Sequence, residues 1–358
     1  MTSDEKYMFR CIELARKGAG YVAPNPMVGA VLVQDDRIIG EGWHARYGEA
    51  HAEVGAIGAT GLATSSGLTS SSNTTLYVSL EPCAHFGKTP PCADLIIRTG
   101  IPKVVIGCRD PFEAVNGKGI EKLRAAGIEV VESVLEKECR ELNKRFFTFH
   151  EKKRPYIILK WAQTADGFMA GASDAPRILI SNEYSNKRVH QWRSEETGIL
   201  VGTNTALQDD PELTNRLWTG PSPVRLVLDM DLRLPASLKL FNGQQKTIVF
   251  NSIKSEESHN MIYYRLDKNK SLISQLMEAL YQLKIQSVLV EGGQQLLDTF
   301  IQSGSWDEAR VITNKSMEIG TGLAAPVVKN AVQGFHEQFS QDELLTWLHT
   351  TDNKNDKV

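Results

Sequence analysis

Four residues in the first hundred positions have the types and spacing of a metal site. His51 and Glu53 lie two apart in "EAHAEVGAI", and Cys83 and Cys92 are the cysteines of "PCAHFGKTPPC". One imidazole and two thiolates suit zinc, and a catalytic zinc site leaves its fourth position to water, whose pKa the metal lowers. Glu53 is then a spare carboxylate that can carry a proton from water to a leaving amine. The pattern predicts zinc held by His51, Cys83 and Cys92, with Glu53 as the catalytic residue.

A second group of polar residues lies in the last two hundred positions. The segment "SVLVEGGQQLLDTF" is an apolar strand that ends at Glu291 and two glycines before a helix, whose free N–H groups suit a phosphate. Arg193 and Arg216 lie at either end of a loop rich in Thr, Asn and Asp, and guanidinium groups suit a phosphorylated or carboxylated substrate. Taken alone, both patterns also fit an ordinary turn and a solvated helix face. No strand is followed by G-x-G-x-x-G, so a Rossmann-type dinucleotide fold is not indicated.

Alternating helices and strands must position these residues. In the first half we expect a helix over 4–18, a hairpin over 29–43, strands over 74–80 and 103–108 with a short helix between them, and two helical pieces over 117–149. Charged residues that end at Arg154-Pro155 interrupt the last helix. Beyond them, strands such as "GILVGT" and "VRLVLD" alternate with helices such as "SLISQLMEALYQL". Both halves are therefore predicted to be α/β, with domains at 1–149 and 155–350 and a polar tail at 351–358.

The composition narrows the classes of protein that fit. The 358 residues are 41% hydrophobic and 23% charged with a net charge of −3, which is typical of an ordinary two-domain protein without a basic surface for nucleic acid. The longest apolar runs fall short of the roughly 18 to 20 residues that cross a bilayer, and the charged N-terminus lacks a signal-peptide core. We therefore expect a cytoplasmic protein with neither a membrane nor a nucleic-acid partner. The five cysteines are an odd number in a long chain without an export signal, so disulfides are not expected. Cys11, Cys108 and Cys139 are expected to be plain thiols.

The spacing of the two cysteines points to one family. Zinc nucleobase deaminases carry H-x-E and P-C-x-x-C, whereas eight residues separate the cysteines here. The longer loop, with "NPMVGAVLV", "GEGWH", "TLYVSLEPC" and "DPFEAVNGKGIEKLRAAGIEV", resembles the deaminase of riboflavin biosynthesis. This resemblance implies a cytidine-deaminase-like three-layer domain in which Asn25 contacts the substrate base and Lys88 its phosphate. The roles of His44 and His85 stay open between structure and function.

The second half resembles the reductase of the same family. The segments "LKWAQTADG", "ILVGTNTALQDDPELTNR", "RLVLD" and "VEGG" occur in order, and the resemblance runs from about residue 4 to 330. It implies a dihydrofolate-reductase-like domain in which Asp209 also orients the substrate or donates a proton to it. The implied NADPH contacts are Gln163, Thr205, Asp209, Gly293, Gln294, Gln295, Leu296, Leu297, Asp298 and Thr299. The implied substrate contacts are Arg177, Arg193, Leu213, Arg216 and Glu291.

Three positions depart from the family pattern. Leu179 stands where a tryptophan commonly packs on the cofactor, Arg177 where a small hydroxyl residue is frequent, and Ala50 where proline is frequent. The first two change expected contacts in the reductase half, and the third changes only a backbone preference before His51. An inactive, reductase-like second domain is thus an alternative hypothesis.

The resemblance implies a bifunctional enzyme that forms a homodimer. It would deaminate a phosphorylated diaminopyrimidinone with Zn²⁺ and then reduce its ribosyl group to ribityl with NADPH. A deaminase of the tRNA-editing type is a rival, but it predicts the short cysteine spacing and a basic surface. A purely structural zinc is another, and it predicts a fourth protein ligand.

Overall fold

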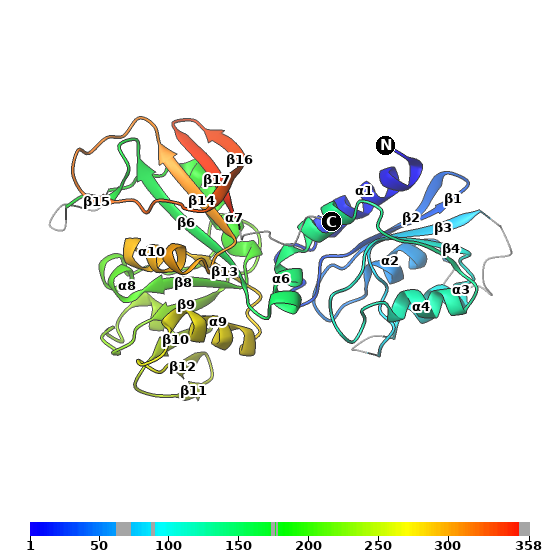
Figure 1. Ribbon diagram of the computed structural model, residues 1–358, viewed down its shortest axis with the longest axis horizontal. Coiled ribbons are helices and arrows are strands. Elements are labelled where there is room, and N and C mark those ends of the chain that lie inside the picture. The colour runs from blue at the N-terminus through cyan, green and yellow to red at the C-terminus, as the bar shows by residue number, and fades with distance from the viewer. Residues whose placement is uncertain (62–72, 87–89, 173–175, 177, 351–358) are drawn as a thin grey trace. The chain divides into compact units, whose positions relative to one another are not determined.

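The computed structural model describes residues 1–61, 73–86, 90–172, 176 and 178–350, and the chain divides into two compact units, Met1–Lys153 and Arg154–Val358 (Figure 1). The division follows the end of a helix: Lys153 has a left-handed φ of 54°, and Pro155 cannot continue a helix. The predicted polar tail, 351–358, lies outside the described residues. Among the helices of the described part, none is long and apolar enough to cross a membrane.

The N-terminal unit is built on a five-stranded sheet. Its strands are β1 (Gly29–Gln34), β2 (Arg37–Trp43), β3 (Thr74–Leu80), β4 (Lys103–Cys108) and β5 (Glu129–Val131). Their order is β2-β1-β3-β4-β5, with β1 antiparallel to both neighbours and β3, β4 and β5 parallel. The helices are α1 (Ser3–Arg16), α2 (Ala52–Gly58), α3 (Cys92–Thr99), α4 (Lys118–Ala125), α5 (Glu136–Leu142) and α6 (Lys144–Lys152).

Alternate residues of these strands face two helical layers. Ala30 and Leu32 of β1 pack with α2, α3 and α4, whereas Val31 and Val33 pack with α1 and α5. A strand that is buried on both faces has this period of two. The predicted three-layer α/β architecture of this unit is therefore confirmed (Figure 1).

Residues 117–149 differ from the expected two helical pieces. They contain α4, α5 and most of α6, and β5 lies between α4 and α5. Gly127, at a left-handed φ of 80°, follows α4, and Val130 and Val131 then pair with β4. β-Branched residues beside a parallel strand favour extended structure, so the long-range pairing overrides the helical pattern.

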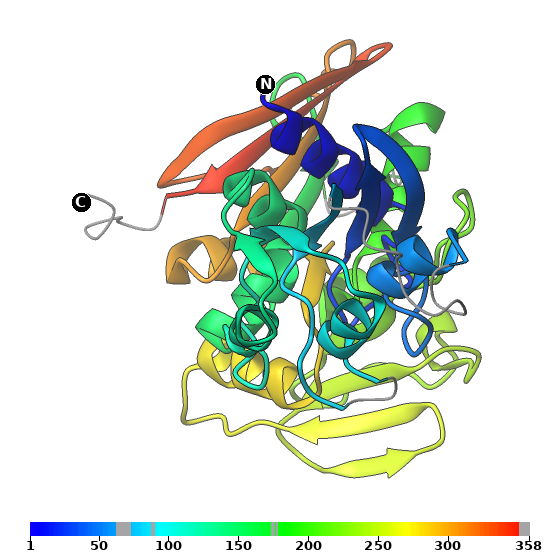
Figure 2. The same ribbon diagram turned by 90° about the vertical axis from the view of Figure 1, so that its right-hand side faces the viewer.

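The C-terminal unit contains a ten-stranded sheet. Its strands are β6 (Tyr156–Thr164), β8 (Gly198–Gly202), β9 (Val224–Leu228), β10 (Thr247–Asn251), β11 (Glu256–Ser258), β12 (Met261–Arg265), β13 (Ser287–Val290), β14 (Glu308–Asn314), β16 (Ala331–Phe339) and β17 (Asp342–His349). Their order is β11-β12-β10-β9-β8-β13-β6-β14-β17-β16. The strands from β12 to β14 in this order are parallel, and β16 and β17 form a hairpin at one edge (Figure 2). A separate pair joins β7 (Phe168–Ala170) and β15 (Leu323–Ala324).

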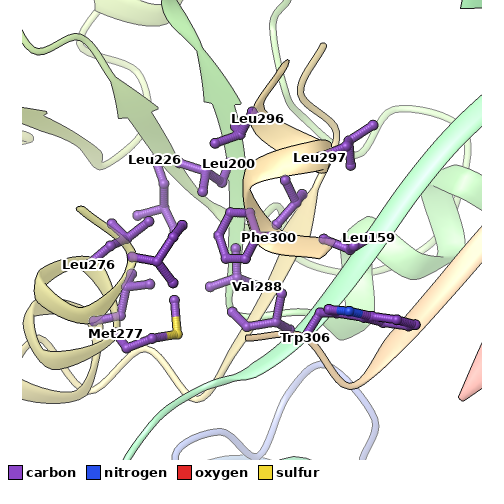
Figure 3. Close-up of a cluster of buried hydrophobic side chains, with 14 of the residues drawn as sticks. Leu159, Leu200, Leu226, Leu276, Met277, Val288, Leu296, Leu297, Phe300 and Trp306 are labelled. Carbon is purple, nitrogen blue, oxygen red and sulfur yellow. The ribbon is translucent and has the colours of Figure 1, made fainter. Parts of the chain in front are cut away.

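Helices cover both faces of this sheet. They are α7 (Glu183–Glu195), α8 (Thr203–Asp209), the 3-10 turn η1 (Lys239–Phe241), α9 (Leu272–Gln282) and α10 (Gln294–Ser303). On one face, Leu276 of α9 and Phe300 of α10 pack on Leu200, Leu226 and Val288 of the sheet (Figure 3). Residues of α7 and α8 pack on the other face. The main core of this unit thus lies between the sheet and α9 with α10.

The strand order places three carboxyl ends side by side. β8, β13 and β6 are parallel neighbours, and the residues that follow them lead into loops or helices at one edge of the sheet. Parallel α/β sheets bind their ligands at this edge. The described members of the second group of predicted site residues come from these strand ends, from α7, α8 and α10, and from the loop that follows α8.

Candidate functional sites

His51, Cys83 and Cys92 converge in the N-terminal unit. Their ligand atoms all lie within 4.8 Å of one another. His51 Nδ1 is 3.2 Å from Cys92 Sγ and 3.6 Å from Cys83 Sγ. An imidazole and two thiols at this separation fit the donor set that zinc prefers, with one position left for water.

Two helix starts and one strand end bring the three side chains together. His51 is the extended residue before α2, Cys92 is the first residue of α3, and Cys83 lies just beyond β3. The Cys92 N–H points at Cys83 Sγ at 3.4 Å. Hydrogen bonds from Cys92 and then from His51 lower the pKa of the Cys83 thiol to about 4, and the same pairing raises the pKa of Cys92. The centre therefore favours a thiolate at Cys83, which is the form that binds metal.

Glu53 lies in the first turn of α2 beside these ligands. Its side chain is 3% exposed, and burial raises its pKa to about 7. A carboxyl group that titrates near neutral pH can both accept and return a proton. The two-residue spacing from His51 is thus what a ligand followed by a proton carrier requires.

His44 links the predicted substrate residue Asn25 to the metal centre. His44 Nδ1 lies 3.1 Å from the Ala50 carbonyl oxygen, so this nitrogen carries the hydrogen, and Nε2 can accept from Asn25 Nδ2 at 3.2 Å. Its ring meets the His51 ring edge-on at 5.4 Å between centroids. Burial lowers the pKa of His44, which favours the neutral form that these contacts need. The sequence alone does not reveal this role, because the approach of His44 to Ala50 depends on how the connecting loop folds.

The remaining predicted residues around this centre are less informative. Lys88 lies outside the described residues. His85 is exposed, and its ring contacts Phe112 at 6.0 Å between centroids.

In the C-terminal unit, Arg193 and Glu291 form a bidentate ion pair. Arg193 Nε and Nη2 lie 2.9 and 2.8 Å from the two carboxylate oxygens of Glu291, and Arg193 Nη1 donates to the Thr214 carbonyl oxygen at 3.2 Å. Lys160 Nζ is 4.0 Å from the same carboxylate, and all three charged side chains are at most 14% exposed. Two cations thus surround one anion at the carboxyl edge of the sheet.

Electrostatics hold this cluster in its charged state. Burial alone would raise the pKa of Glu291, but the charges of Arg193 and then Lys160 outweigh it and lower the pKa to about 2. Burial lowers the pKa of Lys160, whereas the neighbouring Glu291 carboxylate favours its charged form. With Arg193 and Lys160 both protonated, the cluster carries a net positive charge, which suits a phosphate.

Lys160 is not among the residues that the sequence motifs predict for this site. It follows Leu159, which pairs with Val290 across β6 and β13, so Lys160 and Glu291 are neighbours across two strands. The only sequence signal is a lysine within the buried strand "YIILKWA", where a charged residue needs a partner.

Two helix starts lie at the same edge of the sheet. Gly202 precedes α8 and Gly293 precedes α10, and neither N-cap has a capping side chain among the described residues. The Gly293 N–H donates to Thr205 Oγ1 at 2.8 Å, which joins the two helix starts. A Cβ at Gly293 would lie 3.0 Å from that oxygen, so the close approach favours glycine. The geometry fits the phosphate groups of a dinucleotide cofactor.

The other predicted cofactor contacts differ in how far their side chains are exposed. The side chains of Leu296 and Leu297 are buried in the core between the sheet and α10 (Figure 3). Gln163 Oε1 accepts from Trp161 Nε1 at 2.8 Å at the end of β6, and Asp209 is the last residue of α8. Four more residues of the α10 start are wholly or partly accessible, namely Gln294, Gln295, Asp298 and Thr299.

The predicted substrate contacts also differ in how far their side chains are exposed. Leu213 has a positive φ of 52° and its side chain packs in the core with Ala206, so only its backbone can meet a ligand. Arg216 is half exposed, and its side chain contacts Glu212 and Thr214. Its backbone N–H donates to Nδ1 of the buried His190 at 2.8 Å. Arg177 lies outside the described residues.

Leu179, the main departure from the family pattern, is 77% exposed. Its side chain does not stand in for a buried tryptophan. A leucine has no aromatic ring, so it cannot stack on the cofactor as a tryptophan at this position would.

Comparisons with known proteins match each half of the chain to a described domain. Residues 1–108 match the cytidine and deoxycytidylate deaminase zinc-binding region, and residues 155–323 match the RibD C-terminal domain. The riboflavin biosynthesis protein RibD of Aquifex aeolicus is 42% identical over 327 residues, covering 90% of this chain and 89% of the relative. That of Synechocystis is 38% identical over 355 residues, covering 98% and 93%.

A solved structure covers almost the whole chain. The diaminohydroxyphosphoribosylaminopyrimidine deaminase/5-amino-6-(5-phosphoribosylamino)uracil reductase of Thermotoga maritima aligns with a TM-score of 0.85 at 37% identity, covering 97% of this chain and 99% of that one. The match confirms a cytidine-deaminase-like domain followed by a dihydrofolate-reductase-like domain. The chain therefore belongs to the RibD family of riboflavin biosynthesis, in which a deaminase and a reductase are joined.

Proposed function

We propose that this chain catalyses two consecutive steps of riboflavin biosynthesis on a small phosphorylated pyrimidine. The N-terminal unit hydrolytically deaminates the diaminohydroxyphosphoribosylaminopyrimidine, and the C-terminal unit reduces the ribosyl group of the product to ribityl. The cofactors are Zn²⁺ and NADPH. The observation that carries the proposal is the pairing, on one chain, of a His-Cys-Cys cluster beside a buried glutamate with a cationic cluster beside two uncapped helix starts.

In the deaminase, His51, Cys83 and Cys92 would hold the zinc, which when bound activates water. Glu53 accepts a proton from that water through a carboxylate oxygen and passes it to the departing amino nitrogen. A C–O bond forms, the C–N bond breaks, and ammonia leaves. Asn25, which His44 orients, contacts the base of the substrate, and Lys88 contacts its phosphate.

In the reductase, NADPH when bound supplies a hydride to the sugar carbon of the ring-opened imine, and the imine nitrogen takes a proton. The start of α10, from Gly293 to Thr299, would hold NADPH together with Gln163, Thr205 and Asp209. The substrate is positioned by the side chains of Arg177, Arg193, Arg216 and Glu291 and by the backbone of Leu213. Asp209 orients the sugar or donates the proton.

A deaminase with an inactive second unit is the competing function, and the exposed Leu179 favours it. The charged cluster of Lys160, Arg193 and Glu291 favours an active unit, because three buried charges are costly to keep without a ligand to bind. The tRNA-editing alternative lacks support from the net charge of −3.

The two steps can be tested separately. A chelator should abolish ammonia release, and added zinc should restore it. The deaminated aminouracil substrate should drive NADPH oxidation by the same chelated protein. Oxidation that never exceeds a no-enzyme control would establish the inactive second unit instead.

Assembly as a homodimer and a cytoplasmic location stay predictions of the resemblance. Sedimentation of the purified chain tests the first, because a dimer has twice the mass of the 39.7 kDa chain. Fractionation of the source cells tests the second.

A further inference from the structure

Glu81 is a buried carboxylate two residues before Cys83, and neither proposed reaction uses it. Its side chain is 3% exposed and lies just beyond β3. Its two oxygens accept hydrogen bonds from the backbone N–H groups of Asp110 (3.3 Å), Gly117 (2.9 Å), Gly119 (2.9 Å) and Ile120 (3.4 Å). Four donors of one segment therefore converge on one side chain.

Three of these donors, the N–H groups of Gly117, Gly119 and Ile120, lie at the start of α4, and the fourth follows β4. Gly117 precedes this helix and offers no side chain to cap it. The first N–H groups of a helix need an acceptor, and a negative charge there is favourable. Glu81 supplies both from another part of the chain, so the segment before Cys83 and the start of α4 are held as one piece.

The backbone of residues 81–83 lies between two helices. A Cβ at Gly119 would overlap the Pro82 carbonyl oxygen, so the start of α4 lies directly against this segment. On the other side, the Cys83 carbonyl oxygen accepts from the Ala93 N–H at 3.1 Å, within α3. A displacement at Glu81 would therefore move Cys83 relative to Cys92 and His51.

We propose that Glu81 is a positioning residue of the metal centre, which sets the place of Cys83 by binding the start of α4. The inference rests on the proposed zinc site and adds a residue outside its ligand set, because the Glu81 oxygens are directed at backbone donors. Metal ligands must be held to within roughly 0.5 Å, and residues behind the ligands typically change metal affinity roughly 10- to 100-fold.

Two variants test this from opposite sides of one contact. Glu81→Gln keeps the shape but turns one acceptor oxygen into an NH₂ group that faces N–H donors. Gly119→Ala keeps the Glu81 charge but pushes the start of α4 away from Pro82. The matched control is Asp229→Asn in the C-terminal unit, where a carboxylate that is 1% exposed accepts the N–H groups of Arg233 and Leu234 at 3.1 and 3.0 Å.

The readout is zinc affinity of the full-length chain in competition with a chromophoric chelator. We expect Glu81→Gln and Gly119→Ala each to bind zinc roughly 10- to 100-fold more weakly, with deaminase activity recovering at high zinc and reductase activity unchanged. Asp229→Asn should bind zinc like the wild type.

Other outcomes separate the two levels of the proposal. If the wild type binds no zinc, the proposed function itself fails. If the wild type binds zinc and both variants bind it as tightly as the wild type, the positioning role is wrong. The role is also wrong if Glu81→Gln alone binds zinc more weakly, because the contact with the start of α4 then does not matter. If Glu81→Gln does not fold, the zinc affinities of Gly119→Ala and of the shorter Glu81→Asp test the role instead. Wild-type zinc affinity in both variants would overturn it.

Discussion

Glu53 and Glu291 are both buried carboxyl groups, and their surroundings shift their pKa values in opposite directions. Burial beside the thiols raises the pKa of Glu53 to about 7, whereas Arg193 and Lys160 lower the pKa of Glu291 to about 2. A group that titrates near neutral pH suits proton transfer, and a permanently charged one suits the fixing of neighbouring cations. The residue types alone do not distinguish these roles; the neighbours do.

Glu53→Gln should abolish deamination while leaving the fold intact. The amide has nearly the same shape but carries no proton between water and the amine, so kcat for ammonia release should fall roughly 10²- to 10⁴-fold. Zinc content, measured by metal analysis, and reductase activity should not change. Glu49→Gln, at an exposed position nearby, is the control. Full ammonia release by the Glu53 variant would show that another group carries the proton.

Glu291→Gln should destabilise the C-terminal unit in a pH-dependent way. It leaves Arg193 and Lys160 buried without their anion, which costs about 3 kcal/mol in the free energy of unfolding. Because the pKa of Glu291 is lowered, the wild-type advantage is complete above pH 4.5 and is lost as the pH falls towards about 2.

Urea unfolding of both proteins between pH 3 and pH 7 measures this difference. The exposed pair of Lys254 and Glu256 provides the control, since Glu256→Gln should change stability by less than about 1 kcal/mol. A difference between wild type and Glu291→Gln that is the same at all pH values would contradict the assigned charge state.

At the scale of elements, α2 must lie close to β2 to place His51 and Glu53. A Cβ at Gly42 would overlap backbone atoms of Ala52 and Ala56, whereas one at Gly58 would meet nothing within 4 Å. Gly42→Ala should therefore push α2 outward, weaken zinc binding and lower the melting temperature. Gly58→Ala should keep zinc affinity and stabilise α2 by up to about 1 kcal/mol, because alanine favours helix. Equal zinc affinity and melting temperature in the two variants would contradict this packing.

The joined starts of α8 and α10 predict a specific cofactor defect. Thr205→Val removes the acceptor of the Gly293 N–H, a loss of about 1 kcal/mol, so KM for NADPH should rise roughly fivefold. Ser303→Ala, which removes a hydroxyl at the far end of α10, is the control. Steady-state NADPH oxidation gives both values, and an unchanged KM for Thr205→Val would separate this turn from the cofactor site.

The elements show what the sequence could and could not predict. The strands of the sheets and the zinc motif follow from local patterns, because apolar periodicity and ligand types are local properties. Lys160 and His44 were not assigned, because their neighbours come from strand pairing and loop approach between distant segments. The short β5 was missed for the same reason: its partner β4 stabilises it.

At the scale of the whole molecule, each unit has its own core and its own proposed site. The buried clusters around α2 to α4 and around α9 with α10 belong to different units. No residue of either proposed site comes from the other unit among the described residues. The two chemistries should therefore be separable by variants in one unit at a time.

The most direct measurement of the two-step function supplies the diaminohydroxyphosphoribosylaminopyrimidine to the zinc-loaded chain, with and without NADPH. Ammonia release and NADPH oxidation are followed in the same tube. We predict ammonia in both cases, and oxidation that lags behind ammonia and disappears in Glu53→Gln. No ammonia from the zinc-loaded chain would contradict the role of the His51, Cys83 and Cys92 centre, and ammonia without oxidation would leave only a deaminase.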